Sequence, residues 1–204
     1  MERKNNYLIQ ARQAKEHFLE YDQQKLIRKL GLRADDTYLY PVFLGQKYRI
    51  HRETGDFSRW NGVEWVDANT FEEVLTLLDL ICDSREDRFL TGRWKNMQAF
   101  GQMFHQNLLE NERNPFARAI QEHPQAFRDA CESIGGKVIS SADIAYSIEV
   151  FDGLPIGLFF WEGDDEFEPR IRYFWDENAS MYIRYETMYY AVNLLVQMIW
   201  DRMQ

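Results

Sequence analysis

The chain has little cysteine, and the two cysteines that it has are far apart. Cys82 and Cys131 each stand without a close-spaced partner among 204 residues. Iron–sulfur clusters usually require four thiolates, so this chain cannot ligate a cluster alone. Reduced, buried thiols in a cytoplasm are the simplest interpretation, because disulfides persist mainly in oxidising compartments. We therefore expect a cytoplasmic protein.

Long apolar runs and an excess of positive charge are also missing. The longest apolar runs, 154–161 and 191–200, are too short or too interrupted by Asn193 and Gln197 to cross a bilayer. The first six residues lack the apolar stretch of a secretory signal, so we expect no export. A net charge of -9 repels nucleic-acid phosphates and anionic headgroups. The sequence thus predicts neither a nucleic-acid nor a membrane partner.

One basic cluster interrupts this acidic balance, at a spacing that suits one side of a helix and its continuation. It consists of Lys25, Arg28, Lys29 and Arg33. Charge runs of this kind usually form a solvated helix face. We expect that role here.

Complete catalytic and metal-binding motifs are absent as well. The chain contains no Gly-x-Ser-x-Gly elbow, and Gly135-Gly136-Lys137 lacks the first glycine and the serine or threonine of a phosphate loop. The histidines show neither the i, i+4 pair of a zinc protease helix nor a nearby cysteine cluster; they are His17, His51, His105 and His123. We predict no catalytic residue, no metal ligand and no cofactor.

What is present is the composition of a folded protein. Hydrophobic residues make up 45% of the chain and charged residues 28%, which argues against disorder. A chain of this length can bury a substantial core, and no low-complexity linker divides it. We expect residues 1–204 to form a single domain.

The N-terminal half predicts helices and strands in alternation. Helical periodicity runs from Leu8 to a stop at Gly31, which indicates one long helix. Strands are expected at 38–44, 48–52, 57–60 and 63–66. Asn61-Gly62 favours a two-residue hairpin that sets Arg59 opposite Glu64 and Trp60 opposite Val63. A capping box at residues 70–73 then begins a helix that reaches Cys82.

The C-terminal half carries the clearest patterns. Pro115 and Pro124 suit helix starts, and short helices are expected at 115–122 and 125–134. Strands at 144–150, 156–161 and 170–175 predict a meander, and a closing amphipathic helix covers 185–199. The predicted fold class is α+β, with antiparallel β meanders packed against amphipathic helices.

The second hairpin of that meander carries an acidic segment at its tip, and this is the candidate binding site. Carboxylates held this close raise one another's energy, so they must stay in water or acquire a cation, an arginine or a proton. We expect an exposed tip beside aromatic strand residues that belong mainly to the core. The candidate binding residues are Trp161, Glu162, Asp164, Asp165, Glu166 and Glu168.

Other roles for this segment remain open. Hard divalent ions prefer oxygen ligands, although the spacing does not fit the calcium-loop template. An arginine-paired loop is a further alternative, with Arg170, Arg172 and Arg184 nearby in the sequence. A carboxylate pair for acid/base hydrolysis could come from the acids on or beside the same strands; these are Asp143, Glu149, Glu162 and Asp176.

The C-terminal third also resembles a known family. The resemblance rests on residues 154–156, 161–167 and 172–176, with weaker similarity at Phe43-Leu44-Gly45 with Tyr48 and at 91–94. On these motifs the chain is similar to an uncharacterised bacterial and archaeal family, domain of unknown function 3786. The resemblance implies no established activity. Some longer members carry a cysteine-rich segment suited to an iron–sulfur cluster, from which this chain departs.

Together these observations favour a cytoplasmic, non-catalytic binding or accessory protein. It would use the acidic tip and the adjoining aromatics to bind a protein or small-molecule ligand that the sequence does not identify. The alternative is a metal- or carboxylate-dependent hydrolase that uses the same loop.

Overall fold

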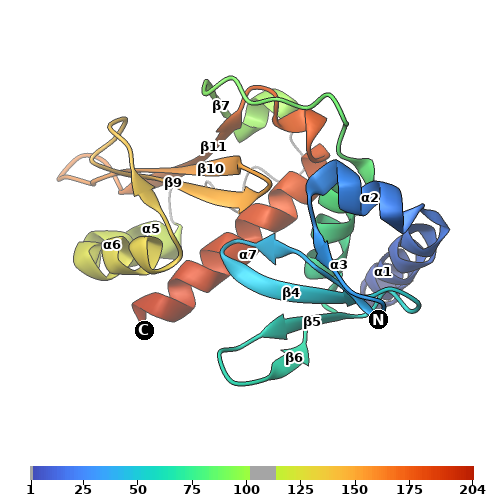
Figure 1. The fold of residues 1–204 in the computed structure, drawn as a ribbon. Helices are drawn as coiled ribbons and strands as arrows, with labels where there is room; N and C mark the ends of the chain where they lie inside the picture. The colour runs from blue at the N-terminus through green and yellow to red at the C-terminus, as the bar shows by residue number, and fades with distance from the viewer. Residues whose placement is uncertain (1, 102–113) are drawn as a thin grey trace. The chain divides into compact units, whose positions relative to one another are not determined.

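The computed structural model describes residues 2–101 and 114–204, with side chains from residue 6 onward. The chain divides into two compact units (Figure 1). Unit 1 comprises residues 1–88 and 181–191, and unit 2 comprises residues 89–180 and 192–204. Helices and antiparallel sheets occur in both, which confirms the α+β prediction. The single-domain prediction remains a prediction.

Unit 1 begins with two helices, α1 (Glu2–Glu20) and α2 (Gln23–Leu30), where one long helix was expected. The chain breaks between them because the Asp22 side chain caps α2, accepting from the backbone N–H groups of Gln24 and Lys25. The predicted stop is confirmed. Gly31 ends α2 with φ 60°, a left-handed conformation that glycine adopts without steric cost.

The sheet of unit 1 is antiparallel throughout. In the described chain its order is β1-β2-β4-β5-β6, and β3 pairs with β4. The strands are β1 (Arg33–Ala34), β2 (Tyr38–Tyr40), β3 (Val42–Phe43), β4 (Gln46–His51), β5 (Phe57–Trp60) and β6 (Trp65–Asp67). Along β4 the side chains alternate, with Tyr48 and Ile50 buried on one face of the sheet.

The predicted register of the β5–β6 hairpin is wrong. Trp60 lies opposite Trp65, and Arg59 lies opposite Val66. Asn61 accepts with Oδ1 from the N–H groups of Val63 and Glu64, so the connection is four residues long. A shift by two residues keeps each side chain on its face of the sheet, and here it pairs two indoles.

Unit 1 is completed by α3 (Phe71–Leu78) and by the start of α7 (Tyr185–Met203). Thr70 caps α3, as predicted, by accepting from the Glu73 N–H. The last turn of this helix, Asp79–Asp83, widens into a π-helix. None of the helices that the structure describes is long and apolar enough to cross a membrane.

Unit 2 contains a second antiparallel sheet, whose order in the described chain is β7-β11-β10-β9-β8. Its strands are β7 (Trp94–Asn96), β8 (Lys137–Val138), β9 (Ile144–Phe151), β10 (Leu154–Trp161) and β11 (Arg170–Asp176). Its helices are α5 (Pro115–Glu122), α6 (Pro124–Ser133) and the rest of α7, with short 3-10 turns at Met97–Phe100 and Ala179–Met181. The predicted meander and both proline-led helices are present.

The largest buried rings of unit 2 lie on one face of this sheet. Tyr146, Phe160, Tyr173 and Trp175 are at most 1% exposed. Phe127 of α6 packs edge-on against Tyr146, and Phe116 of α5 packs against Phe127. Large rings at alternate strand positions thus bury one side of the hairpin that carries the candidate site.

Candidate functional site

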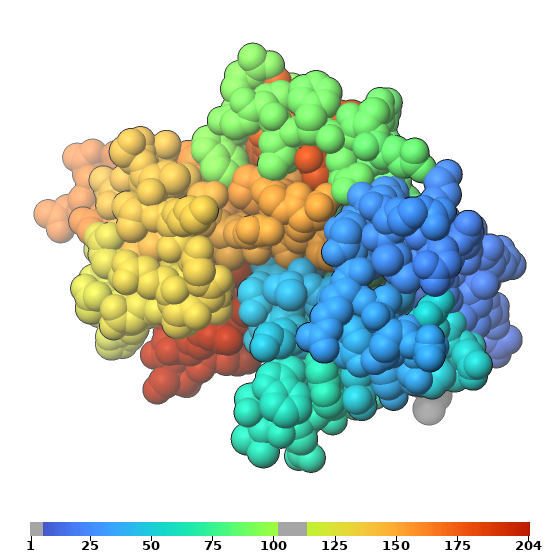
Figure 2. Space-filling view, viewed as in Figure 1, coloured from blue at the N-terminus to red at the C-terminus, as the bar shows by residue number. Residues whose placement is uncertain are grey.

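The acidic loop, residues 162–169, joins β10 to β11. These strands pair from Ile156↔Trp175 to Trp161↔Arg170, and the last pair closes the base of the loop. The guanidinium of Arg170 lies 5.4 Å from the centre of the Trp161 ring, a cation–π contact. Trp161 is half-buried, whereas Glu162, Asp164, Asp165, Glu166 and Glu168 are all exposed. Figure 2 shows the acidic loop, in orange, at an outer edge of unit 2.

Asp164 organises the backbone of the loop. Its Oδ1 accepts from the N–H groups of Glu166 and Phe167 at 2.8 Å each, and its own N–H donates to the Phe167 carbonyl at 2.9 Å. Because these bonds favour the ionised carboxylate, they lower the pKa of Asp164. Asp164 therefore shapes the loop and leaves its neighbours to face solvent.

Gly163 lies where the loop folds back on itself. A Cβ atom at this position would lie 2.6 Å from the Pro169 nitrogen and 2.8 Å from the Phe167 carbonyl oxygen. Such distances are shorter than real Cβ contacts. The close approach of the two backbone segments thus requires glycine.

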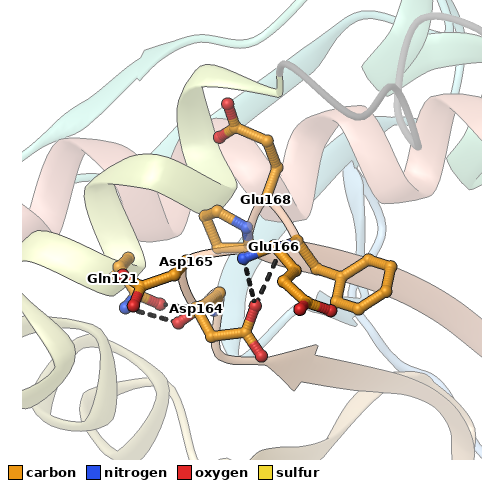
Figure 3. A pocket seen from close by; sticks show the side chains of 8 residues that line it. Gln121, Asp164, Asp165, Glu166 and Glu168 are labelled. Atoms are coloured by element: carbon orange, nitrogen blue, oxygen red, sulfur yellow. Dashed lines mark hydrogen bonds between the residues drawn. The ribbon is translucent and has the colours of Figure 1, made fainter.

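Helix α5 holds the loop from the side. Gln121 accepts from the Gly163 N–H with Oε1 at 3.0 Å and donates from Nε2 to the Gly163 carbonyl at 3.5 Å (Figure 3). One turn earlier, Arg118 forms an ion pair with Glu168 at 3.0 Å. On the other side, Asp143 accepts from the Glu162 N–H at 2.9 Å. The loop is therefore fixed at both ends.

The loop and Gln121 line an open hollow of about 490 Å³. In Figure 3 the carboxylates of Asp164, Asp165, Glu166 and Glu168 point in different directions. Within residues 2–101 and 114–204, no group of three or more His, Cys, Asp or Glu side chains is arranged to hold a metal ion. The loop thus presents separate negative charges around a shallow hollow.

One residue of this loop and one residue of α5 were not identified by the sequence analysis. Phe167, which lies between Glu166 and Glu168, is 69% exposed although its side chain is apolar. Its signal was an apolar residue inside a charge run. Arg118 is the arginine that pairs with the loop, and no local signal identified it because it is 50 residues from Glu168.

Of the arginines that the sequence suggested, Arg170 lies at the base of the loop. Arg170 stacks on Trp161, and Arg172 is half-buried on β11. Arg184 belongs to unit 1, where it pairs with Asp79 and Asp83.

Three of the four carboxylates considered for hydrolysis bind backbone N–H groups. Asp176 is 2% exposed and accepts from the N–H groups of Thr91 and Gly92 at 2.9 and 2.7 Å. Glu149 accepts from the Gly153 N–H, and Asp143 from that of Glu162. These acids therefore stabilise turns and strand ends.

The cysteines and histidines add no further candidate. Cys82 and Cys131 are free and buried, and burial raises the pKa of Cys82 to about 12. His17 lies 3.4 Å from Glu20, and His51 packs edge-on against Tyr38. His123 is exposed at the end of α5, and His105 lies outside the described residues.

Comparisons with known proteins place the chain in one family. Searches among curated proteins and among solved structures found no match. The sequence model of the family described as "Domain of unknown function (DUF3786)" matches residues 22–198. Because this match covers far more than half of the chain, the protein belongs to that family, as its C-terminal motifs indicated.

Proposed function

We propose that this protein is a cytoplasmic, non-catalytic binding or accessory protein, and that the acidic loop contacts a positively charged partner. The observation that carries the proposal is a loop with exposed charges and a fixed backbone. Asp164, Gln121 and Asp143 hold its main chain through six hydrogen bonds, while Asp165 and Glu166 extend into solvent. A fixed loop loses little conformational entropy on binding.

Phe167 supports a protein partner over a small ion. An exposed ring surrounded by acids can enter an apolar hollow on a partner, and the acids around it can pair with arginine or lysine at the rim. Aromatic anchors of this kind carry much of the energy of protein interfaces. The partner class is therefore a basic protein surface with an apolar depression.

The hydrolase alternative has weaker support. A metal site needs several oxygens directed at one point, and the loop's carboxylates diverge. The carboxylates of Asp143, Glu149 and Asp176 are already engaged with backbone N–H groups. A thermal-shift titration with magnesium, manganese and calcium tests this alternative directly, and we expect no stabilisation at millimolar ion.

A binding assay with matched variants tests the proposal. The probes are immobilised peptides of mixed lysine, arginine and leucine, with scrambled acidic peptides as the negative set. We expect the double variant Asp165→Asn/Glu166→Gln to bind the basic peptides at least about fivefold more weakly, because rim charges contribute modestly to affinity. Phe167→Ser should weaken binding further.

The control variant is Asp36→Asn/Glu53→Gln, which removes the same charge from exposed positions of unit 1. It should bind like the unmodified protein. Equal binding by the loop variant and this control would show that the loop does not contact the partner. Loss of binding at high salt in the unmodified protein would be consistent with the proposed charge pairing.

A further inference from the structure

Unit 1 contains a second cavity, which the sequence analysis did not identify. It has a volume of about 570 Å³, within the range of about 300–1,000 Å³ that is usual for small-molecule sites. Its lining includes aromatic and basic residues from β1, β2, β4, β5 and β6: Arg33, Tyr40, Lys47, Tyr48, Trp60 and Trp65. The cavity is formed entirely within unit 1.

The aromatic walls are held in place by one another. Trp60 and Trp65 are directly opposite on β5 and β6, with ring centres 5.5 Å apart at 63°. Tyr40 of β2 lies 6.3 Å from Trp65. Tilted and edge-on ring pairs at these distances attract one another, so the walls are set before any ligand enters.

Tyr48 borders the cavity, but its side chain lies on the opposite, buried face of β4 from that of Lys47. It is 2% exposed, and its hydroxyl donates to Glu73 Oε1 at 3.0 Å. Arg59 reaches the same Glu73 oxygen at 3.6 Å. The Glu73 carboxylate is thus occupied by Tyr48 and Arg59, and it does not line the cavity.

The charged residues of the lining are both positive. Arg33 and Lys47 are exposed. The Asp35 carboxylate accepts from the Tyr40 hydroxyl at 2.6 Å and lies near enough to Arg33 for the two charges to attract each other. Arg33 lies over the Tyr40 ring at 5.1 Å. On the same face of the sheet, the guanidinium of Arg49 lies 4.8 Å from the centre of the Trp65 ring.

Two basic residues thus line the cavity, although the chain as a whole has a net charge of -9. Arg33 belonged to the cluster that predicted a solvated helix face, but the structure places it on β1 beside the aromatic rings. Rings recognise a planar ring by stacking, and the two cations recognise an anion. The cavity therefore matches a ligand that has both features.

We propose that this cavity binds a small planar aromatic anion, a ring system that carries a carboxylate or a phosphate. The rings of Trp60, Trp65 and Tyr40 contact the planar group, and Arg33 and Lys47 pair with the negative charge. This site is separate from the acidic loop, which belongs to unit 2 and would attract the opposite charge.

Isothermal titration calorimetry with matched probes tests the proposal. Indole-3-acetate and AMP provide a ring with a carboxylate or a phosphate. Indole-3-ethanol and adenosine provide the rings without the charge, and acetate and inorganic phosphate provide the charge without a ring. We expect at least one aromatic anion to bind with a Kd below about 1 mM, and its uncharged and ringless analogues to bind at least about tenfold more weakly.

The two aromatic anions distinguish the source of the charge. Tighter binding of indole-3-acetate assigns the site to carboxylates, and tighter binding of AMP assigns it to phosphates. Lys47→Gln should weaken the affinity for the aromatic anion that binds by at least about fivefold. Arg28→Gln removes the same charge from an exposed position on α2, outside the lining, and should have no effect.

Trp65→Leu should abolish binding, with folding checked by circular dichroism. The proposal is overturned if no aromatic anion binds below about 1 mM, or if an uncharged analogue binds as tightly as its anion. It is also overturned if Lys47→Gln and Arg28→Gln bind alike. If a proline-rich peptide or a single-stranded oligonucleotide binds more tightly than every aromatic anion tested, the proposal is overturned as well.

Discussion

The Asp79 carboxylate holds Arg184 through both its main chain and its side chain. It accepts from the Arg184 N–H and from its Nε at 2.8 Å each, although 105 residues separate the two. Thr187 also donates its hydroxyl to Asp79. The Asp79 side chain is 1% exposed, so the π-helical end of α3 supplies a buried cap for the first turn of α7.

Replacing Asp79 should therefore destabilise unit 1. Asp79→Ala leaves three donors without their acceptor, and we expect a loss of about 3 kcal/mol in the free energy of unfolding. Urea unfolding followed by circular dichroism measures this loss. Asp83→Asn is the control, since Asp83 is 33% exposed and should cost less than about 1 kcal/mol. Similar losses from both variants would contradict the capping role.

Asp176 should be a structural residue with no part in chemistry. Its buried carboxylate binds the N–H groups of Thr91, Gly92 and Asn178, so Asp176→Ala should cost about 2–3 kcal/mol of stability. The variant should still bind a basic peptide at the acidic loop, as long as the assay temperature lies below the temperature at which the variant unfolds. A variant of unchanged stability that lost a hydrolytic activity would instead support the catalytic alternative.

The acidic loop should change its structure at low pH. The bonds that lower the pKa of Asp164 favour the ionised carboxylate, so this stabilisation is present above the ordinary value of 3.8 and is lost as the pH falls through the lowered value. An NMR titration should show the amide signals of Glu166 and Phe167 moving together with a midpoint below pH 3.8. Asp164→Ala should abolish that transition, and Asp165→Ala should preserve it. A midpoint above 3.8 would contradict the hydrogen-bonded geometry.

Both thiols should be unreactive in the folded protein. Burial is the largest cause that raises the pKa of Cys82 to about 12, and it also raises the pKa of Cys131. A raised thiol pKa means that stability declines as the pH rises from the ordinary 9.0 towards the folded value. Ellman's reagent at pH 8 should label neither cysteine in buffer and both in urea. Rapid labelling without urea would show that the thiols are accessible.

Much of the local structure could be predicted because it depends on short-range chemistry. Gly31 ends α2, Thr70 caps α3, and Pro115 and Pro124 begin their helices, since each effect involves residues within one helical turn. The first strand of the C-terminal meander follows from the alternation of apolar and polar residues at 144–150, and Asp152-Gly153 marks the turn into the second. The acidic loop could be located because its charged residues lie between two predicted strands.

Other features depend on residues that are distant in the sequence. The β5–β6 register was wrong because the Asn61 side chain and the pairing of Trp60 with Trp65 outweigh the preference of Asn61-Gly62 for a tight turn. The capping box was only half correct. Glu73 accepts from the hydroxyls of Thr70 and Tyr48 inside the core, a partnership that no local pattern indicates.

The sequence by itself determined the fold class, most helix ends, the longer strands and the position of the acidic loop, because periodicity and capping act over a few residues. Only the tertiary structure decided that Arg118 and Gln121 hold this loop, that Phe167 is exposed on it, and that Arg33 and Lys47 meet aromatic rings in a cavity. These relationships join segments far apart in the chain. They arise when packing brings such segments together, and no short window of sequence contains both partners.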